Sequence, residues 1–229
     1  MVGAIPALVA RIGVALLAAV VAFRYGVGIA AWRAANRLEK PSYDVLARIG
    51  PRMEVRAYAP YVVAEATMRG GESSMAALTG DGFRKCAGYI FGKRNTDRAT
   101  GASRGMAMTA PVRIAQRDDA TTRRDGSTVK VSFVMARNES LRTLPVPTDA
   151  DVRLRQVPAH TAAFVAFAGG RPSETLVARK RAALDHAVKK HGFRPVRNAE
   201  TLTYGYHDPF ITPKFLRKNE VGCFIERVC

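Results

Sequence analysis

The feature that most constrains the fold is an arrangement of elements that occurs twice along the chain. Residues 53–58 alternate apolar and polar side chains with the period that buries one face of a strand, and a second strand follows at 61–68. A Gly-Gly turn, a helical segment and two more strands around a polar hairpin loop at 117–126 come next. The same succession restarts with strands at 152–157 and 160–168 and closes with a strand at 221–227. Neither half alone could easily bury its sheet face. We therefore predict one α+β domain with a curved antiparallel sheet, two packed helices and an internal pseudo-two-fold repeat.

Each repeat contains one segment with helical periodicity. The first begins near Ser73 or Ser74, and its inward face is predicted to carry Phe83, Cys86, Ala87, Ile90 and Phe91. Glycines weaken this helix as an isolated structure, so packing has to hold it. The second has Ser173 as a suitable N-cap and Gly192 as a suitable stop.

Residues 1–41 differ from the domain predicted over residues 42–229. Residues 12–23 form an unbroken apolar run, and apolar character resumes after Arg24 and continues to Trp32. The first run alone has the length of a signal-peptide core, whereas both runs together reach the length of a membrane span with an interfacial Trp. We predict an uncleaved, membrane-associated N-terminal anchor with a short linker at 38–41. The alternatives are a cleaved signal that leaves a secreted or periplasmic protein, an organellar targeting segment, and a buried soluble helix.

The charge balance is strongly basic, with 36 Lys and Arg against 19 Asp and Glu and a net charge of +17. Such a charge favours anionic partners such as a lipid surface or a ligand with carboxylates. The cations are spread along the chain, and zinc-finger spacing is absent, so no nucleic-acid partner is expected. Three cysteines without a CxxC motif form neither a disulfide framework nor a metal cluster. Because no catalytic fingerprint is present, we do not expect an enzyme.

A set of short runs spread over residues 42–229 resembles the SOUL heme-binding proteins. The runs occur in family order: 43–46 (YDVL), 54–58 (EVRAY), 82–92 (GFRKCAGYIFG), 106–112 (MAMTAPV), 131–135 (VSFVM), 147–149 (PTD), 167–170 (FAGG), 205–210 (GYHDPF) and 217–221 (RKNEV). Two positions depart from the family pattern. His207-Asp208 stands where members often have Asp-Pro, and Gly222 stands where a Trp is frequent.

The resemblance implies a distorted antiparallel β-barrel with two helices. It also implies non-covalent binding of heme or another porphyrin in a hydrophobic groove between the first helix and a loop joining late strands. The family shares no single axial ligand. On this basis we expect a membrane-tethered, non-catalytic tetrapyrrole carrier, buffer or sensor. The alternative is a basic interaction module that docks on an anionic membrane or a protein partner without heme.

Nine residues form the expected cofactor site: Phe83, Arg84, Ala87, Ile90, Met106, Met108, Tyr206, His207 and Phe210. The apolar members would form the flat slot that a porphyrin needs, and Arg84 would meet a propionate. His207 is the candidate metal ligand, because His is a common axial ligand of heme iron. The competing interpretation is that the apolar residues are ordinary core and the cations a solvated face.

Overall fold

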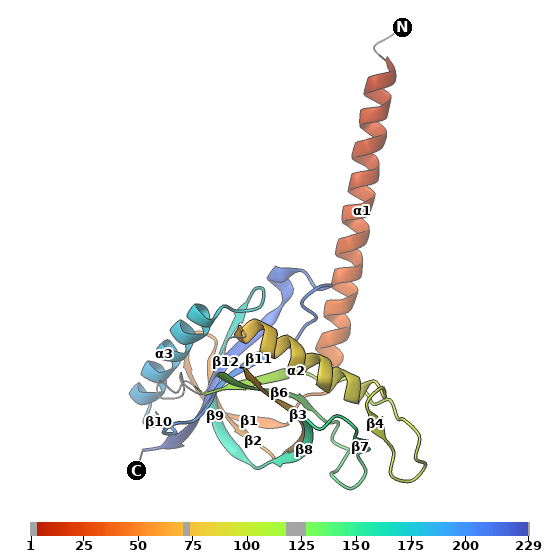
Figure 1. Ribbon diagram of the computed structural model, residues 1–229. Helices are drawn as coiled ribbons and strands as arrows, with labels where there is room; N and C mark the ends of the chain where they lie inside the picture. Colours follow the sequence, from red (N-terminus) through yellow and green to blue (C-terminus); the bar gives the residue numbers. More distant parts are fainter. Residues whose placement is uncertain (1–3, 71–73, 118–126, 229) are drawn as a thin grey trace.

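The computed structural model describes residues 4–70, 74–117 and 127–228 (Figure 1). Helix α1 (Ala4–Arg37) projects away from the rest of the chain, and strand β1 (Tyr43–Gly50) follows it. The first repeat comprises β2 (Met53–Tyr58), β3 (Tyr61–Gly70), α2 (Met75–Ile90), β5 (Val112–Gln116) and β6 (Ser127–Val134). The second comprises β8 (Val152–Val157), β9 (His160–Ala168), α3 (Glu174–Lys190), β11 (Thr201–Gly205) and β12 (Lys218–Arg227). The connections contain β4 (Asn95–Thr96), β7 (Val146–Pro147), β10 (Phe193–Pro195) and the 3-10 helix η2 (Lys214–Leu216).

The main sheet confirms the predicted repeat. Its strands pair antiparallel in the order β1-β2-β9-β12-β11-β5-β6-β3-β8, with β10 also on β12. The order from β2 to β8 has two-fold symmetry. Reversing it gives the same order once each strand is replaced by its counterpart in the other repeat: β2 by β8, β3 by β9, β5 by β11 and β6 by β12. The β5–β11 pairing lies at the centre of this two-fold relation. The α+β class with a curved antiparallel sheet is therefore confirmed.

Helices α2 and α3 pack on the same face of the sheet, one on each repeat. Cys86 and Ile90 of α2 are fully buried against β3 and β6, and Leu184 and Val188 of α3 are fully buried against β9 and β12. The N-caps are Ser74 and Ser173, whose side chains accept hydrogen bonds from the first turn of each helix. Each helix thus begins where the chain leaves one strand pair and returns over it.

The predicted inward face of α2 was partly wrong. Phe83 is 40% and Phe91 57% exposed, whereas Tyr89 is fully buried. The reason is a close approach at Gly82, where a Cβ atom would lie only 2.7 Å from Val131 Cγ2. This contact turns the glycine side of the helix toward β6 and leaves the two phenyl rings at the margin.

The opposite face of the sheet lines the inside of the curl. The ring of Tyr61 on β3 lies 5.9 Å from the ring of His160 on β9 and 6.3 Å from the ring of Tyr58 on β2, although β3 neighbours neither strand in the sheet. Such contacts require the sheet to curve around this face. The interior is unusually polar, because Arg56 and Glu220 are buried within it.

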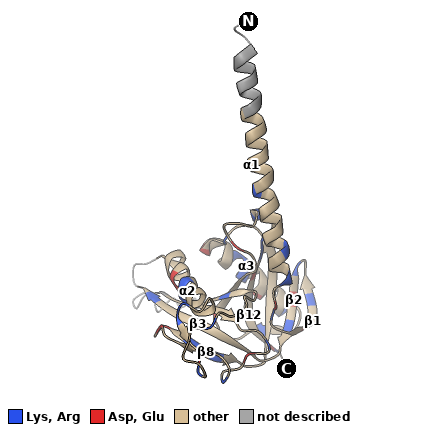
Figure 2. Cartoon of the chain, turned by 90° about the vertical axis from the view of Figure 1, so that its right-hand side faces the viewer, with Lys and Arg blue, Asp and Glu red and all other residues tan. Residues whose placement is uncertain are grey.

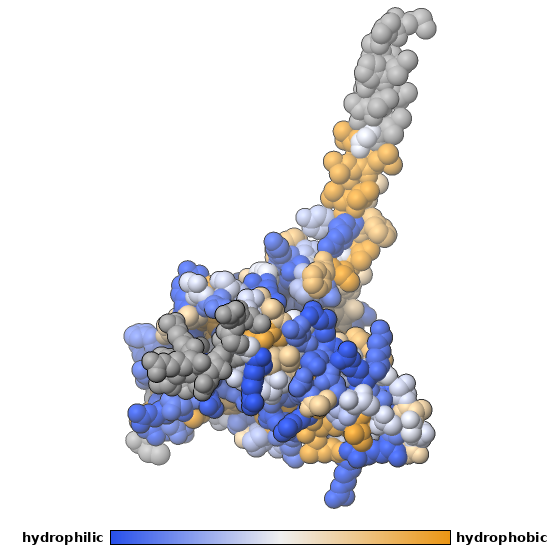
Figure 3. Space-filling view, in the orientation of Figure 1, coloured by the Kyte–Doolittle hydropathy of each residue, from blue (hydrophilic) through white to orange (hydrophobic). Residues whose placement is uncertain are grey.

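Helix α1 contacts the domain only near its C-terminal end. Residues 13–37 are long and apolar enough to cross a membrane by length and composition, and 6% of the span is buried. Figure 3 shows this part of α1 as a hydrophobic column above a largely hydrophilic domain. Arg24 donates hydrogen bonds to the carbonyl oxygens of Phe210 (2.6 Å) and Ile211 (2.8 Å), and Gly28 is buried against Pro213. The helix is therefore fastened to the loop between β11 and β12.

Candidate functional site

Five of the nine expected site residues are apolar and lie at α2, together with Arg84 of the same helix. Phe83, Ala87 and Ile90 belong to the helix, while Met106 and Met108 belong to the extended segment that precedes β5. The backbone N–H of Met106 donates to Ile90 O at 2.8 Å, which fixes this segment against the end of the helix. All but Phe83 belong to, or pack against, the core cluster beneath α2.

The exposed part of this group is an apolar strip rather than a deep slot. Ile90 is only 1% exposed and belongs to the core, whereas Phe83 is 40% exposed with its ring edge-on to Phe133 at 5.2 Å. Ala87 lies one turn after Phe83 in the helix and is half-buried, as are Met106 and Met108, which pack on the same core cluster as Ala87. A flat hydrophobic ligand can therefore cover Phe83 and its half-buried neighbours but cannot reach Ile90.

Two cationic side chains extend from the same helix, and only one of them can turn toward a ligand. The side chain of Arg84 is 74% exposed and pairs with Asp81 one turn away. Lys85 is held by Asp149 and Asp151, each at 3.0 Å. Arg84 is thus the α2 cation whose guanidinium can turn toward a ligand carboxylate.

Tyr206 lies inside the half-barrel instead of on a ligand surface. Its hydroxyl donates to Glu220 at 2.6 Å, and Glu220 also pairs with Arg56 at 2.8 and 2.9 Å and with Lys218 at 2.9 Å. Arg56 and Glu220 are 3% and 0% exposed. This network is a part of the molecule that the sequence analysis missed, because the charged residues of β2 and β12 alternate with apolar ones as on a solvent-facing side of a strand. It fastens both ends of the β11–β12 loop.

Glu220 stays ionised although it is fully buried. Burial alone would raise the pKa of its carboxyl, but the hydrogen bonds and charge of Arg56, with help from Lys218 and Tyr206, hold that pKa below the ordinary 4.5. Arg56 also pairs with Glu54 at 3.0 Å, which is 26% exposed. The Arg56–Glu220 ion pair therefore remains charged and links β2 to β12.

His207 is half-buried at the start of the same loop. Its Nδ1 accepts a hydrogen bond from the backbone N–H of Lys218 at 3.1 Å, and its Nε2 is buried without a partner among the described residues. Burial lowers the pKa of the imidazole, and the charges of Lys218, Lys40 and Arg217 lower it further. The ring is therefore neutral, and because Nδ1 acts as an acceptor, its single proton sits on Nε2.

Phe210 is separated from this buried region. It is 81% exposed, and the Asp208 carboxylate accepts hydrogen bonds from the N–H groups of Phe210 and Ile211, both at 2.7 Å. This turn, together with Arg24, places Phe210 beside α1. Among the described residues, no hydrogen bond, ion pair or ring contact joins Phe210 or His207 to the α2 group.

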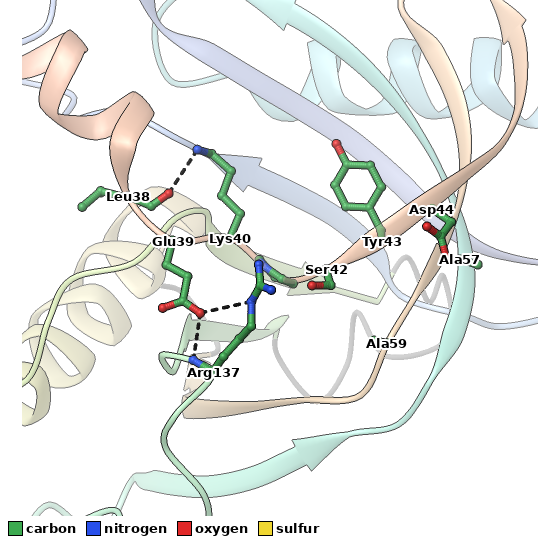
Figure 4. Close-up of a pocket in the computed structure, with 10 residues that line it drawn as sticks. Leu38, Glu39, Lys40, Ser42, Tyr43, Asp44, Ala57, Ala59 and Arg137 are labelled. Carbon is green, nitrogen blue, oxygen red and sulfur yellow. Dashed lines mark hydrogen bonds and ion pairs between the residues drawn. The ribbon is translucent and has the colours of Figure 1, made fainter.

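The connection between the two groups is the segment after α1. Glu39 forms a bridge with Thr109, next to Met108, and Leu38 packs against the cluster that contains Tyr206. The segment at 38–41, expected as a short linker, thus packs against the domain. Beside it lies an open pocket of about 570 Å³, in which Glu39 pairs with Arg137 at 3.3 Å (Figure 4). Its charged walls do not suit the apolar faces of a porphyrin.

The described residues contain no group of three or more His, Cys, Asp or Glu that could hold a metal ion. Cys86 cannot serve as a nucleophile, because it is fully buried and burial raises the pKa of its thiol to about 12. Its Sγ contacts the carbonyl oxygens of Ala64 and Val131 at 3.6 and 3.4 Å. No pairing of Cys86 with His207 occurs.

Comparison with known proteins shows which family and which solved structures this chain is similar to. The model of the SOUL heme-binding protein family matches residues 38–224. Among solved structures, the chain is similar to the EcmrR C-terminal domain, with a TM-score of 0.53 and 15% identity over 81% of this chain and 99% of that one. It is also similar to a hydrolase from Listeria innocua, with a TM-score of 0.52 and 11% identity over 76% and 92% of the two chains. These likenesses show the fold alone. No curated protein matched the chain.

Proposed function

The chain belongs to the SOUL heme-binding family, and on that premise we propose that it binds heme or a related tetrapyrrole non-covalently while tethered to a membrane. The role we assign is a carrier, buffer or sensor rather than an enzyme. The observation that carries the proposal is the exposed apolar strip on α2, with Phe83 40% exposed beside the half-buried Met106 and Met108. Exposed aromatic and thioether groups next to a free cation suit a flat, apolar ring with carboxylates at its edge.

The residues present fit the ring and one propionate. Phe83 and Met108 would contact the ring, and Arg84 would pair with a propionate after releasing Asp81. Bound heme would supply an iron centre for ligand exchange or electron transfer. The chain would contribute hydrophobic contact and charge.

The role of His207 as a metal ligand stays a prediction. An iron-binding His usually donates its other ring N–H to an acceptor, which leaves the ligating nitrogen unprotonated. In His207 the opposite holds, because Nδ1 accepts from Lys218 and the proton is on Nε2. This arrangement favours binding through the α2 strip without a bond from His207 to iron.

The test is a titration of the full chain in detergent micelles with hemin and, separately, with metal-free protoporphyrin. We expect saturable absorption changes with both. Phe83→Ser should weaken binding about five-fold, since covering the exposed part of the ring is worth about 1 kcal/mol. Phe215→Ser is the matched control, because Phe215 is 66% exposed but lies beside α1. His207→Ala should leave the bound spectrum unchanged. A flat response to both porphyrins would contradict the proposal.

Membrane tethering is supported by the surface around the base of α1. Phe210, Ile211 and Phe215 are 81%, 41% and 66% exposed, and they lie in the loop that Arg24 binds. Side chains of this kind partition into the boundary between headgroups and acyl chains. We therefore place the membrane boundary near Arg24. About 20 helical residues precede it in α1, the length needed to cross about 30 Å of hydrocarbon.

The position of the boundary can be measured with the single tryptophan of the chain, Trp32. It lies eight residues beyond Arg24, or about 12 Å along the helix. In nanodiscs, lipids brominated on their acyl chains should quench Trp32 weakly and should quench Phe215→Trp strongly in a Trp32→Phe background. Strong quenching of Trp32 would show instead that the helix crosses the membrane further along, with Trp32 as its interfacial anchor.

The alternative function is a basic module that docks on anionic lipid or a protein partner without heme. Lys and Arg side chains are spread over the domain, in keeping with the net charge of +17 (Figure 2). Binding to anionic vesicles that falls with salt, in a protein that shows no porphyrin response, would favour this alternative.

A further inference from the structure

The inside of the half-barrel contains a buried arginine that forms no ion pair with any carboxylate among the described residues. Arg113 lies on β5, opposite Tyr204 of β11 and Ser132 of β6, and is 2% exposed. Its Nε and Nη1 atoms are buried and have no hydrogen-bond partner among the described residues. Burying a guanidinium without a partner is costly, so such a group is expected to have one in the functional protein.

The carboxylate nearest in the sheet is already engaged. Glu65 accepts from Arg155 at 2.6 and 2.9 Å and from Ser132 at 2.8 Å. The guanidinium of Arg113 instead lies 5.9 Å from the ring of Phe224, a weak cation–π contact. The internal ion pairs therefore leave Arg113 as a surplus positive charge.

Arg113 lines a cleft of about 370 Å³ together with Arg117, Lys130, Arg155 and His160. The cleft thus has four Lys and Arg side chains. Within the described part of the chain, two of them are paired: Lys130 with Glu200 at 2.6 Å and Arg155 with Glu65. The remaining two leave an excess of two positive charges. A cleft with this charge suits a small anion of one or two negative charges.

The second residue of the cleft with an unsatisfied atom is His160, through its Nε2. Its Nδ1 lies 2.8 Å from Pro158 O, so Nδ1 carries the proton and Nε2 presents a lone pair. Nε2 is buried and has no partner among the described residues. The ring is fixed by stacking on Tyr58 at 5.0 Å and by an edge contact with Phe224 at 5.2 Å.

These atoms define the chemistry of a ligand. Arg113 offers two N–H donors to anionic oxygen, and His160 offers an acceptor to a hydroxyl group. A carboxylate or a sulfate satisfies the arginine but has no hydroxyl for the histidine. Hydrogen phosphate and protonated phosphate monoesters satisfy both. We propose that the interior cleft binds a phosphate group that retains a hydroxyl, with Arg113 and His160 as its recognition residues. This site is separate from the α2 strip and does not depend on tetrapyrrole binding.

The experiment uses the full chain in phosphatidylcholine nanodiscs in a phosphate-free buffer at constant ionic strength. Thermal unfolding and isothermal titration are followed against inorganic phosphate, glycerol 3-phosphate and sulfate. We expect saturable stabilisation by the phosphates and at least about ten-fold weaker binding of sulfate, a difference of about 1.4 kcal/mol. Nanodiscs that contain phosphatidic acid separate a lipid headgroup from a soluble source, because only a headgroup ligand would raise the melting temperature there.

Variants decide whether the named residues are responsible. Arg113→Met should abolish the effect of phosphate and, without anion, unfold at the same or a higher temperature, because the unpaired charge is gone. His160→Phe should remove the preference for phosphate over sulfate. Arg48→Gln, at a side chain that is 82% exposed, is the charge-matched control and should change neither property. Unaltered phosphate binding in Arg113→Met, equal binding of sulfate by the wild type, or destabilisation of Arg113→Met without anion would each overturn the proposal.

Discussion

Removing the charge of Glu220 tests the internal network that holds the β11–β12 loop. In Glu220→Gln, the carboxylate that pairs with Arg56 at 2.8 and 2.9 Å becomes a neutral amide of nearly equal size. Shape is preserved, so packing changes little. Arg56 remains charged and 3% exposed, with only the partly exposed Glu54 as a partner. The variant therefore isolates the effect of an uncompensated buried charge.

The expected loss of unfolding free energy is about 3–5 kcal/mol, the range for breaking a buried ion pair from one side. Solvent does not screen this ion pair, because Glu220 is fully buried, so the full range applies. In urea, with an m-value of about 2 kcal/mol/M, the midpoint should fall by about 2 M. Replacing both partners by apolar residues, as in Arg56→Met with Glu220→Leu, should restore much of the lost stability, because no charge is then left unpaired.

The same pair predicts a pH dependence with a definite sign. The folded-state pKa of Glu220 is lowered below 4.5, so its contribution is present above that pH and is lost as pH falls through the lower folded-state value. Urea midpoints of the wild type should therefore decrease below about pH 4.5 more steeply than those of Glu220→Gln.

Glu54→Gln is the matched control, because Glu54 contacts the same guanidinium but is 26% exposed. It should cost less than about 1 kcal/mol. Circular dichroism of the full chain in detergent, followed through urea unfolding, measures both variants. The reasoning is refuted if Glu220→Gln loses no more stability than Glu54→Gln.

Two further predictions concern residues buried in the core. Gly222→Ala should lower the unfolding free energy by about 3 kcal/mol, because its new Cβ would overlap an aromatic ring of the interior; Gly205→Ala, where a Cβ meets nothing within 4 Å, should change the urea midpoint little. In a Cys229→Ser background, Cys86 and Cys223 should not react with a maleimide at pH 8, because both are fully buried and burial raises the pKa of each thiol to about 12. Both should react in urea, and rapid labelling of the folded chain would contradict the burial argument.

The strands were predictable where side-chain alternation and turn residues agree. Strands β8 and β9 have the predicted bounds, 152–157 and 160–168, because a Pro-Ala turn separates two clear β patterns. The last strand begins at Lys218 rather than at the predicted 221. Pairing with β9 on one side and β11 on the other extends it toward the loop, and no local pattern reports such pairing. The expected hairpin loop at 117–126 lies, apart from Arg117, outside the described residues.

The arrangement of the candidate site residues was predictable only where it depends on residues close in the sequence. The helix and methionine segments, which the family resemblance groups in one site, contribute to one core cluster. The exposure of Phe210 depends on Arg24, which is 186 residues away, and the burial of Tyr206 depends on Glu220. The departure at Gly222 also has a tertiary cause, since the ring of Phe164 fills the space that a larger residue would need.

The loop between β11 and β12 connects helix α1 to the interior of the domain. At its start Tyr206 is tied to Glu220, and in its middle Arg24 binds the carbonyl oxygens of Phe210 and Ile211. His207 lies between these two attachments, so its position depends on both. A displacement of α1 relative to the sheet would have to move the loop or break the Arg24 bonds, because the Glu220 end is buried and charged. Helix α1 and the buried Glu220 network are thus coupled through this loop.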